Sequence, residues 1–228
     1  MNRRDLLAGV SVSFAGALAT RGRAADAPPG TTSCVLTPVT SEGPYYFDPK
    51  LIRSDISDHQ PGVPLTLELR VVTVKGCVAI RNARVDVWHS NARGIYSGYE
   101  GQRGIGEAPE QSARGQTFLR GTQLTDRDGL TRFRTIYPSW YYGRTPHVHF
   151  KVFLQPREVA VSQIFFPDTV SDRIFAGSQA YVARTRARDT YNETDMYART
   201  GRNGGAFCDV APDGNGYRAA VIVGIRDT

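Results

Sequence analysis

The sequence has few of the features that mark thiol-bound metals or nucleic-acid partners. Only three of its 228 residues are cysteines, Cys34, Cys77 and Cys208, and no Cys-x-x-Cys pair occurs. A zinc–thiolate site is therefore not expected. In an oxidising compartment the three would form one disulfide and one free thiol, but their spacing does not identify the pair. The net charge of +6 comes from scattered Arg and Lys without a basic helix, which argues against a nucleic-acid partner.

The N-terminal region lacks a hydrophobic run long enough for a membrane span. Its apolar stretch at residues 6–19 is too short and too rich in Gly and Ser to cross a bilayer. Arg3 and Arg4 precede this stretch and Ala-x-Ala sites follow it, which is the order of an export signal. The paired arginines favour the twin-arginine route. We therefore predict a signal peptide at residues 1–27 and a single domain at residues 28–228. The protein is then exported, periplasmic or extracellular; a basic tail on a cytoplasmic protein is the alternative.

Helical periodicity is almost absent, and short runs typical of strands take its place. The 23 glycines and 13 prolines imply many turns. Alternating or apolar runs that predict strands lie at residues 64–71, 83–88, 131–136, 147–154, 159–166 and 217–225. Only residues 178–190 could form a short helix. These patterns predict an all-β fold, an antiparallel β-sandwich with long loops and at most one or two short helices.

Two of the four histidines lie at positions i and i+2 of one predicted strand. Within residues 147–154 the even positions are all apolar, so they should face the core. His147 and His149 then share the opposite face, about 6–7 Å apart along the strand. Two imidazoles at this spacing can converge on one metal ion. The alternative is a half-buried strand with two polar residues that point outwards.

Tyrosines, rather than carboxylates, accompany this histidine pair. The sequence offers no obvious third ligand of the two-histidine, one-carboxylate kind. Phenols cluster instead, at Tyr96 and Tyr99 and again at Tyr137, Tyr141 and Tyr142. A phenolate is a hard anionic donor that suits a trivalent ion such as Fe(III), and such an ion lowers the phenol pKa far below about 10. Two phenolates and two neutral imidazoles could hold a ferric ion with a position left for hydroxide or substrate.

Several motifs follow one another in a fixed order along the chain. They are Asp86-Val87-Trp88-His89, Asn91-Ala92-Arg93-Gly94-Ile95-Tyr96-Ser97, Phe118-Leu119-Arg120-Gly121 with Thr125-Asp126-Arg127-Asp128-Gly129, Thr135-Ile136-Tyr137-Pro138-Ser139-Trp140-Tyr141, and Gly143-Arg144 with His147-Val148-His149. In this order they resemble the intradiol ring-cleavage dioxygenases, the family of the catechol, hydroxyquinol and protocatechuate enzymes. The resemblance extends from about residue 34 to about residue 166.

The resemblance implies a bound Fe(3+) with Tyr96, Tyr141, His147 and His149 as its ligands. In the family, the tyrosine at the position of Tyr141 dissociates from iron when the catechol binds. The arginine at the position of Arg144 stabilises negative charge on the bound catecholate. A solvated surface arginine is the alternative for this residue.

The same resemblance implies further site residues. Gln163 matches a family glutamine near the iron, with simple strand packing as the alternative. The loop at residues 41–46 resembles the Thr-x-Gly-Pro-Tyr loop of the family, which lines the substrate pocket. Gly43, Pro44 and Tyr45 are therefore expected in the pocket, with an ordinary turn as the alternative.

The implied activity is cleavage of a catechol-type ring between its two hydroxylated carbons by O2, which gives a cis,cis-muconate-type diacid. His89 lies outside the family's metal ligands and is expected to be structural. The pocket loop and all four ligands belong to one chain, so the resemblance is to the exported, single-chain branch. The expected partners are a catechol-type substrate and O2. A homo-oligomer is compatible with the sequence, which does not define the number of subunits.

Two other interpretations of the same residues stay open. The chain could be an exported, metal-free β-sandwich that serves as a binding module on the same scaffold. Alternatively, His147 and His149 could hold Zn or Cu and support hydrolytic or oxidase chemistry. Metal analysis and a visible absorption band separate these interpretations from the ferric one.

Overall fold

The computed structural model describes residues 34–48, 50–102, 104, 112–182, 187–201 and 207–226. The predicted signal peptide at residues 1–27 lies outside the described residues. None of the helices that the structure describes is both long enough and apolar enough to pass through a lipid bilayer.

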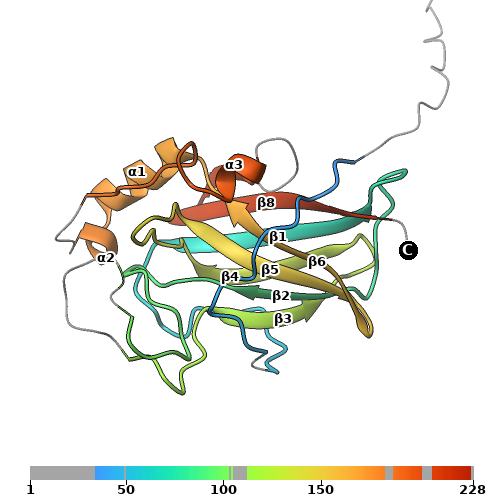
Figure 1. Cartoon of the computed structure of the whole chain (residues 1–228), viewed down its shortest axis with the longest axis horizontal. Coiled ribbons are helices and arrows are strands. Elements are labelled where there is room, and N and C mark those ends of the chain that lie inside the picture. Colours follow the sequence, from blue (N-terminus) through green and yellow to red (C-terminus); the bar gives the residue numbers. More distant parts are fainter. Residues whose placement is uncertain are drawn as a thin grey trace, which may run out of the picture. The chain divides into compact units, whose positions relative to one another are not determined.

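Eight strands in the described residues form two four-stranded sheets (Figure 1). The first sheet has the order β4 (Leu130–Ile136), β1 (Pro64–Thr73), β8 (Gly216–Ile225) and β7 (Asp209–Asp213). The second has the order β3 (Arg120–Leu124), β2 (Arg84–Trp88), β5 (His147–Leu154) and β6 (Arg157–Phe165). Neighbouring strands are antiparallel except β1 and β8, which are parallel. The predicted β-sandwich is confirmed, with one parallel pair in the first sheet.

The core lies between the sheets and follows from alternation along the strands. In β1 the inward positions Leu65, Leu67, Leu69 and Val71 are almost completely buried, whereas the residues between them, Thr66, Glu68 and Arg70, are more exposed. Each strand of this kind hides one apolar face, and burial of one such side chain contributes about 1.5–3 kcal/mol. All six segments predicted as strands contain a strand. The two that were not predicted, β3 and β7, are edge strands that have little apolar alternation.

The helices differ from the sequence-based expectation. The described residues contain α1 (Asp168–Gly177), α2 (Gln179–Val182) and α3 (Ala198–Gly201), one more than the expected limit of two, although α2 and α3 are only four residues long. In the predicted segment, residues 178–190, the described residues 178–182 and 187–190 contain α2 and no other helix. The longest helix begins instead directly after Pro167, a residue that suits a helix start. It buries only Ser171 and Ile174, so its amphipathic pattern was too weak to recognise.

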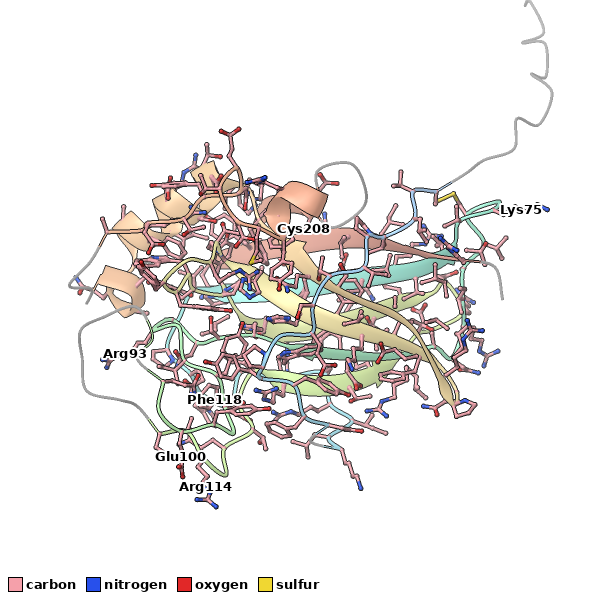
Figure 2. The ribbon with its side chains drawn as sticks, viewed as in Figure 1. Lys75, Arg93, Glu100, Arg114, Phe118 and Cys208 are labelled. Carbon is pink, nitrogen blue, oxygen red and sulfur yellow. A yellow bond between two sulfur atoms is a disulfide. The ribbon has the colours of Figure 1, made fainter. Side chains whose placement is uncertain are left out.

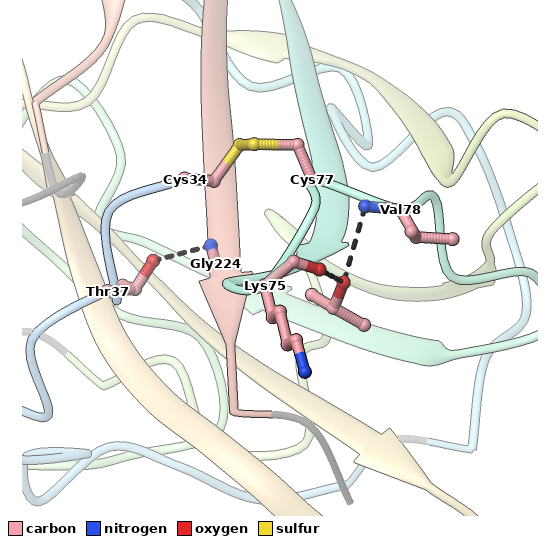
Figure 3. The surroundings of a disulfide bond; sticks show 7 residues. Cys34, Thr37, Lys75, Cys77, Val78 and Gly224 are labelled. Atoms are coloured by element: carbon pink, nitrogen blue, oxygen red, sulfur yellow. Dashed lines mark hydrogen bonds between the residues drawn. A yellow bond between two sulfur atoms is a disulfide. The ribbon is translucent and has the colours of Figure 1, made fainter. Parts of the chain in front are cut away.

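The disulfide that the sequence left undefined joins Cys34 to Cys77, and Cys208 is a free, buried cysteine. Figure 2 shows Cys208 inside the fold, where its thiol donates to the carbonyl oxygen of Phe165 at the end of β6. Figure 3 shows how the disulfide connects the first described residue to the turn after β1, while Gly224 N of β8 donates to Thr37 Oγ1 nearby. The first described segment is thereby attached to the first sheet at two points.

Reduction of this disulfide is expected to lower the free energy of unfolding by about 4 kcal/mol. The bond joins two residues that are 43 apart in the sequence. Opening a loop of that length increases the conformational entropy of the unfolded chain by an amount that corresponds to this free energy. Chemical denaturation with and without dithiothreitol measures the difference. The double variant Cys34→Ser/Cys77→Ser should have the same free energy of unfolding as the reduced protein, and dithiothreitol should not change it. Equal stability of the oxidised and reduced proteins would contradict the prediction.

Candidate metal centre

The register of the second sheet places four site residues in one row across it. Arg120 pairs with Trp88, Trp88 with His149, and His149 with Gln163. Directly paired residues project from the same face of a sheet, so all four lie on the face opposite the core residue Val148. This face is covered by loops, because both histidines of β5 are almost completely buried. The face of β5 that carries His147 and His149, which the sequence predicted to lie opposite the core, is thus the floor of a covered site.

Four side-chain atoms from three parts of the chain converge on this floor. Tyr96 Oη lies 3.1 Å from His147 Nε2 and 3.2 Å from His149 Nε2. The two Nε2 atoms are 3.1 Å apart, and Tyr141 Oη is 3.3 Å from His147 Nε2. Tyr96 comes from the loop after β2, Tyr141 from the loop before β5, and the histidines from β5 itself. The structure therefore brings together all four residues that the resemblance implied as ligands.

The hydrogen bonds around the imidazoles fit a cation at the centre of the four atoms. His147 Nδ1 lies 2.6 Å from the carbonyl oxygen of Thr145, which can only accept, so Nδ1 carries the proton and Nε2 presents its lone pair. That lone pair faces His149 Nε2 across 3.1 Å. Separations of this size equal the edges of a coordination shell whose centre lies about 2 Å from each atom, the usual metal–nitrogen distance. The donor set fits a metal ion bound by two imidazoles and two phenols.

Burial sets the protonation of these groups when no cation is near. It lowers the pKa of His147 and His149 well below 6.5, so both imidazoles are neutral, as a metal ligand must be. Burial also raises the pKa of Tyr96 well above 10 and raises that of Tyr141. The phenols therefore keep their protons unless a cation replaces them. Metal binding at this centre must release phenol protons.

The centre has an unusual composition for a protein metal site. Among the described residues, no group of three or more His, Cys, Asp or Glu side chains could hold a metal ion. Half of the donor atoms here are phenolic oxygens. Hard oxygen donors with nitrogen donors suit a hard or borderline cation rather than a thiophilic one.

The other clustered tyrosines do not join the four donors. Tyr99 donates from its hydroxyl to the carbonyl oxygen of Tyr46, and Tyr137 shares a hydrogen bond with Ser171 on α1. Tyr142 is 76% exposed although it follows Tyr141 directly. Tyr142 lies in a tight turn in which Arg144 N donates to the carbonyl oxygen of Tyr141 at 2.8 Å, so the turn rather than extended backbone separates its side chain from that of Tyr141.

His89 is a buried structural residue, as expected. Its Nε2 lies 2.7 Å from Thr135 Oγ1 and its Nδ1 lies 2.9 Å from the carbonyl oxygen of Ser90. These contacts connect the end of β2 to β4 in the other sheet. Burial lowers the pKa of His89 to about 4, which keeps the ring neutral.

Protonation of His89 is expected to weaken the fold as the pH falls from 6.5 towards 4. The unfolded chain binds this proton below about pH 6.5, whereas the folded chain does so only near pH 4. The stability that the neutral His89 contributes is therefore fully present above pH 6.5, and up to about 3 kcal/mol of the unfolding free energy is lost by pH 4. Denaturant titrations at several pH values should give a shallower slope of unfolding free energy against pH for His89→Gln. Parallel slopes for the two proteins would count against this prediction.

Arg144 lies beside the four donors and divides its nitrogens among three partners. Its Nε donates to Asp195 Oδ2 at 2.8 Å, and one terminal nitrogen, Nη1, donates to Tyr141 Oη at 3.4 Å. The other terminal nitrogen, Nη2, donates to Gln163 Oε1. Its guanidinium also lies over the ring of Tyr197, at 4.8 Å. Arg144 is thus held next to the centre rather than solvated at the surface.

The loop at residues 41–46 covers the centre from the other side. A Cβ on Gly43 would lie 3.2 Å from His149 Cε1, and the backbone of Gly43 has a φ of +71°. Only glycine combines this conformation with such a close approach. The ring of Tyr45 stacks on Tyr96 with centroids 4.6 Å apart, while Pro44 is exposed. Two of the three predicted pocket residues therefore contact the donor residues directly.

Three buried residues of the site were not recognised from the sequence. Trp88 stacks on the ring of His149 at 5.0 Å, and among the described residues His149 Nδ1 has no hydrogen-bond partner. Arg120 is buried, donates to Ser97 and has no carboxylate partner in the described part of the chain. Asp195 pairs with Arg144. Trp88 and Arg120 lie inside motifs, which was the available signal, whereas nothing local distinguishes Asp195 from a surface acid.

The fold and this centre define a β-sandwich protein with two tyrosines and two histidines around one candidate metal position. A family model described as Dioxygenase matches residues 41–201, which is most of the chain. The chain belongs to the intradiol ring-cleavage dioxygenase family.

Curated relatives support this assignment. The chlorocatechol 1,2-dioxygenase of Cupriavidus pinatubonensis is 30% identical over an alignment of 165 residues, and the match covers 61% of this chain and 59% of the relative. The catechol 1,2-dioxygenase of Acinetobacter baylyi is 31% identical over 188 residues, 71% of this chain and 56% of the relative. The chain spans a little over half the length of these relatives.

Solved structures match a larger share of their own chains. An intradiol ring-cleavage dioxygenase from Tetranychus urticae superimposes with a TM-score of 0.75 at 30% identity, covering 85% of this chain and 95% of that one. The dioxygenase domain of a carbohydrate-binding fusion protein from Streptomyces sp. SirexAA-E gives a TM-score of 0.61 at 25% identity, with coverages of 85% and 99%.

Proposed function

We propose that the protein is a non-haem Fe(III)-dependent intradiol dioxygenase. It uses O2 to cleave a catechol-type ring between the two hydroxylated carbons and yields a cis,cis-muconate-type diacid. The observation that carries this proposal is the convergence of two phenolic oxygens and two imidazole nitrogens: the two nitrogens lie 3.1 Å apart, and each lies 3.1–3.3 Å from a phenolic oxygen. When bound, a ferric ion would supply Lewis acidity and electron acceptance towards the catecholate.

Tyr96, His147 and His149 form the permanent part of the centre, because all three are almost completely buried. Tyr141 is the more exposed phenol, since it is only partly buried whereas Tyr96 is almost completely buried. With a cation at the centre Tyr141 would be a phenolate, and its Oη would be the atom that takes the proton of one catechol hydroxyl. Because Tyr141 lies in the loop before β5, its side chain could move aside for the substrate without moving β5.

Arg144 supplies positive charge where the ring becomes anionic. Its guanidinium is mostly withdrawn from water, and a charge in such a position acts more strongly than one in solvent. Gln163 orients this guanidinium through its Oε1 and anchors the loop above the site by donating from Nε2 to the carbonyl oxygen of Ser41 at 2.9 Å. Arg144 acts by its charge and Gln163 by its position, and neither residue has to donate or accept a proton in the reaction.

The loop at residues 41–46 forms one wall of the pocket. Gly43 and Tyr45 lie against His149 and Tyr96, so a flat aromatic ring can enter beside them. This wall and the similarity to catechol 1,2-dioxygenases support a catechol-type aromatic as the substrate.

We also propose that the protein is exported to the periplasm or the cell exterior. The order of arginines, apolar stretch and small-residue site at residues 1–27 supports this location. The disulfide between Cys34 and Cys77 supports it independently, because such bonds persist in oxidising compartments. Cell fractionation of the wild type and an Arg3→Lys/Arg4→Lys variant tests the proposal: export of both to the same extent would speak against the twin-arginine route.

Oxygen uptake on catechol, protocatechuate and hydroxyquinol tests the activity. The expected result is consumption of one O2 per ring by a coloured protein that contains about one iron per chain. Colourless, metal-free protein that binds these aromatics without consuming O2 would indicate a binding module. Zn or Cu after gentle purification would overturn the ferric assignment.

A further inference from the structure

Asp195 is a fully buried acid on the segment that precedes α3. Its side chain is 0% exposed, and both oxygens accept hydrogen bonds. Oδ1 accepts from the backbone N–H groups of Tyr197 at 2.8 Å and Ala198 at 3.0 Å. Oδ2 accepts from Thr145 N at 3.0 Å and from Arg144 Nε at 2.8 Å. An acid this well enclosed cannot move relative to the backbone that surrounds it.

The hydrogen bonds continue from Asp195 to the loop over the centre. Arg144 donates to Gln163 Oε1, and Gln163 Nε2 donates to the carbonyl oxygen of Ser41. Gly43 N in turn donates to Ser41 Oγ at 2.9 Å, so the chain of contacts ends at the glycine that touches His149. Residues from four separate segments are thereby connected through one guanidinium.

The guanidinium depends on Asp195 for its orientation. Arg144 has a long side chain with several rotatable bonds, and its remaining polar partners, Gln163 and Tyr141, are neutral or movable. Asp195 is its only carboxylate partner among the described residues. A charge-assisted hydrogen bond to a rigid acid is about twice as strong as a neutral one, which makes this contact the fixed end of the chain.

We propose that Asp195 is a positioning residue for ring cleavage: it holds the Arg144 guanidinium towards the substrate and, through Gln163, holds the loop at residues 41–46 against His149. The inference rests on the proposed function. The competing role is purely structural, since the contacts to Tyr197 and Ala198 also stabilise the turn that begins α3. The two roles differ in one respect: positioning requires Arg144, whereas stabilisation of the turn does not.

A double-mutant cycle on the iron-loaded, full-length protein separates these roles. Asp195→Asn removes the charge without changing the shape, and kcat is expected to fall about 10- to 100-fold, with iron content and the visible band retained. In the Arg144→Met background the same substitution should change kcat by less than about twofold. Asp55→Asn is the control, since this acid pairs with Arg134, both side chains are exposed, and the substitution should leave kcat unchanged.

Two further measurements, hydrogen exchange and the activity of a second variant, can also disprove the proposal. Hydrogen exchange at residues 41–46 should quicken in Asp195→Asn and in Arg144→Met, which a local effect on α3 would not produce. Asp195→Glu keeps the charge but displaces it, so it should lower kcat even if Asp195→Asn does not fold. Equal losses in both backgrounds of the cycle, or a fully active Asp195→Glu protein, would overturn the positioning role. A wild-type protein that consumes no O2 with any catechol would overturn the reaction itself.

Discussion

Tyr96→Phe is expected to abolish turnover and to bleach the protein. The substitution removes one phenolic oxygen that lies 3.1 Å and 3.2 Å from the two imidazole nitrogens. Replacement of a residue that hydrogen-bonds to a metal ligand already lowers metal affinity or activity about 10- to 100-fold. Loss of the proposed ligand itself should lower them further. The remaining donors carry less negative charge and hold a trivalent ion more weakly. Iron quantitation, the visible spectrum and oxygen uptake measure the three effects together.

Tyr142→Phe is the matched control for this experiment. It removes the same hydroxyl group from a tyrosine that directly follows the proposed ligand Tyr141 in the sequence but is 76% exposed. Its iron content, colour and oxygen uptake should equal those of the wild type. A coloured and fully active Tyr96→Phe protein would contradict the assignment of Tyr96 as a ligand.

Arg144→Met is expected to lower kcat by about 10²–10³-fold while the iron and the colour remain. The methionine occupies similar space but removes a positive charge that faces the site through Tyr141 and Gln163. Loss of a preorganised charge or hydrogen-bond donor in a site that excludes water has an effect of this size. The four donor atoms stay in place, so metal content should not change.

The Arg144→Met variant needs a control for the loss of an ion pair in general. Arg132→Met serves, because Arg132 pairs with Glu68 on an exposed part of the first sheet. Exposed pairs of this kind contribute only about 0–1 kcal/mol to stability, and kcat should stay at the wild-type value. If the two variants lost the same small amount of activity, Arg144 would have no special role in the reaction.

Strand periodicity and motif order were informative over the middle of the chain. The alternation in residues 147–154 correctly placed Val148 in the core and the two histidines on the other face. The order of the motifs led to the family that the comparisons show. Local alternation suffices here because a strand that is buried on one face must repeat every two residues.

Features that depend on long-range contacts were missed. The pairing of Cys34 with Cys77 depends on the first segment lying beside β8, and no spacing rule contains that information. The parallel pairing of β1 with β8 arises between the first and last strands of the described residues. Asp195 meets Arg144 across about fifty residues of sequence, so only the folded chain shows that this acid is buried and paired.

The sequence by itself determined the family, the inward face of most strands and the four residues that meet as donors. The inward faces follow from residue type and two-residue spacing, which local physical rules can interpret, whereas the family and the four donor residues came from the resemblance of the ordered motifs. Only the tertiary structure decided which cysteines pair, where the helices begin, and how Asp195, Gln163 and the loop at residues 41–46 hold Arg144 beside the centre. Those outcomes require segments far apart in the chain to come within hydrogen-bonding distance. Packing of the whole sandwich, rather than any local preference, sets that distance.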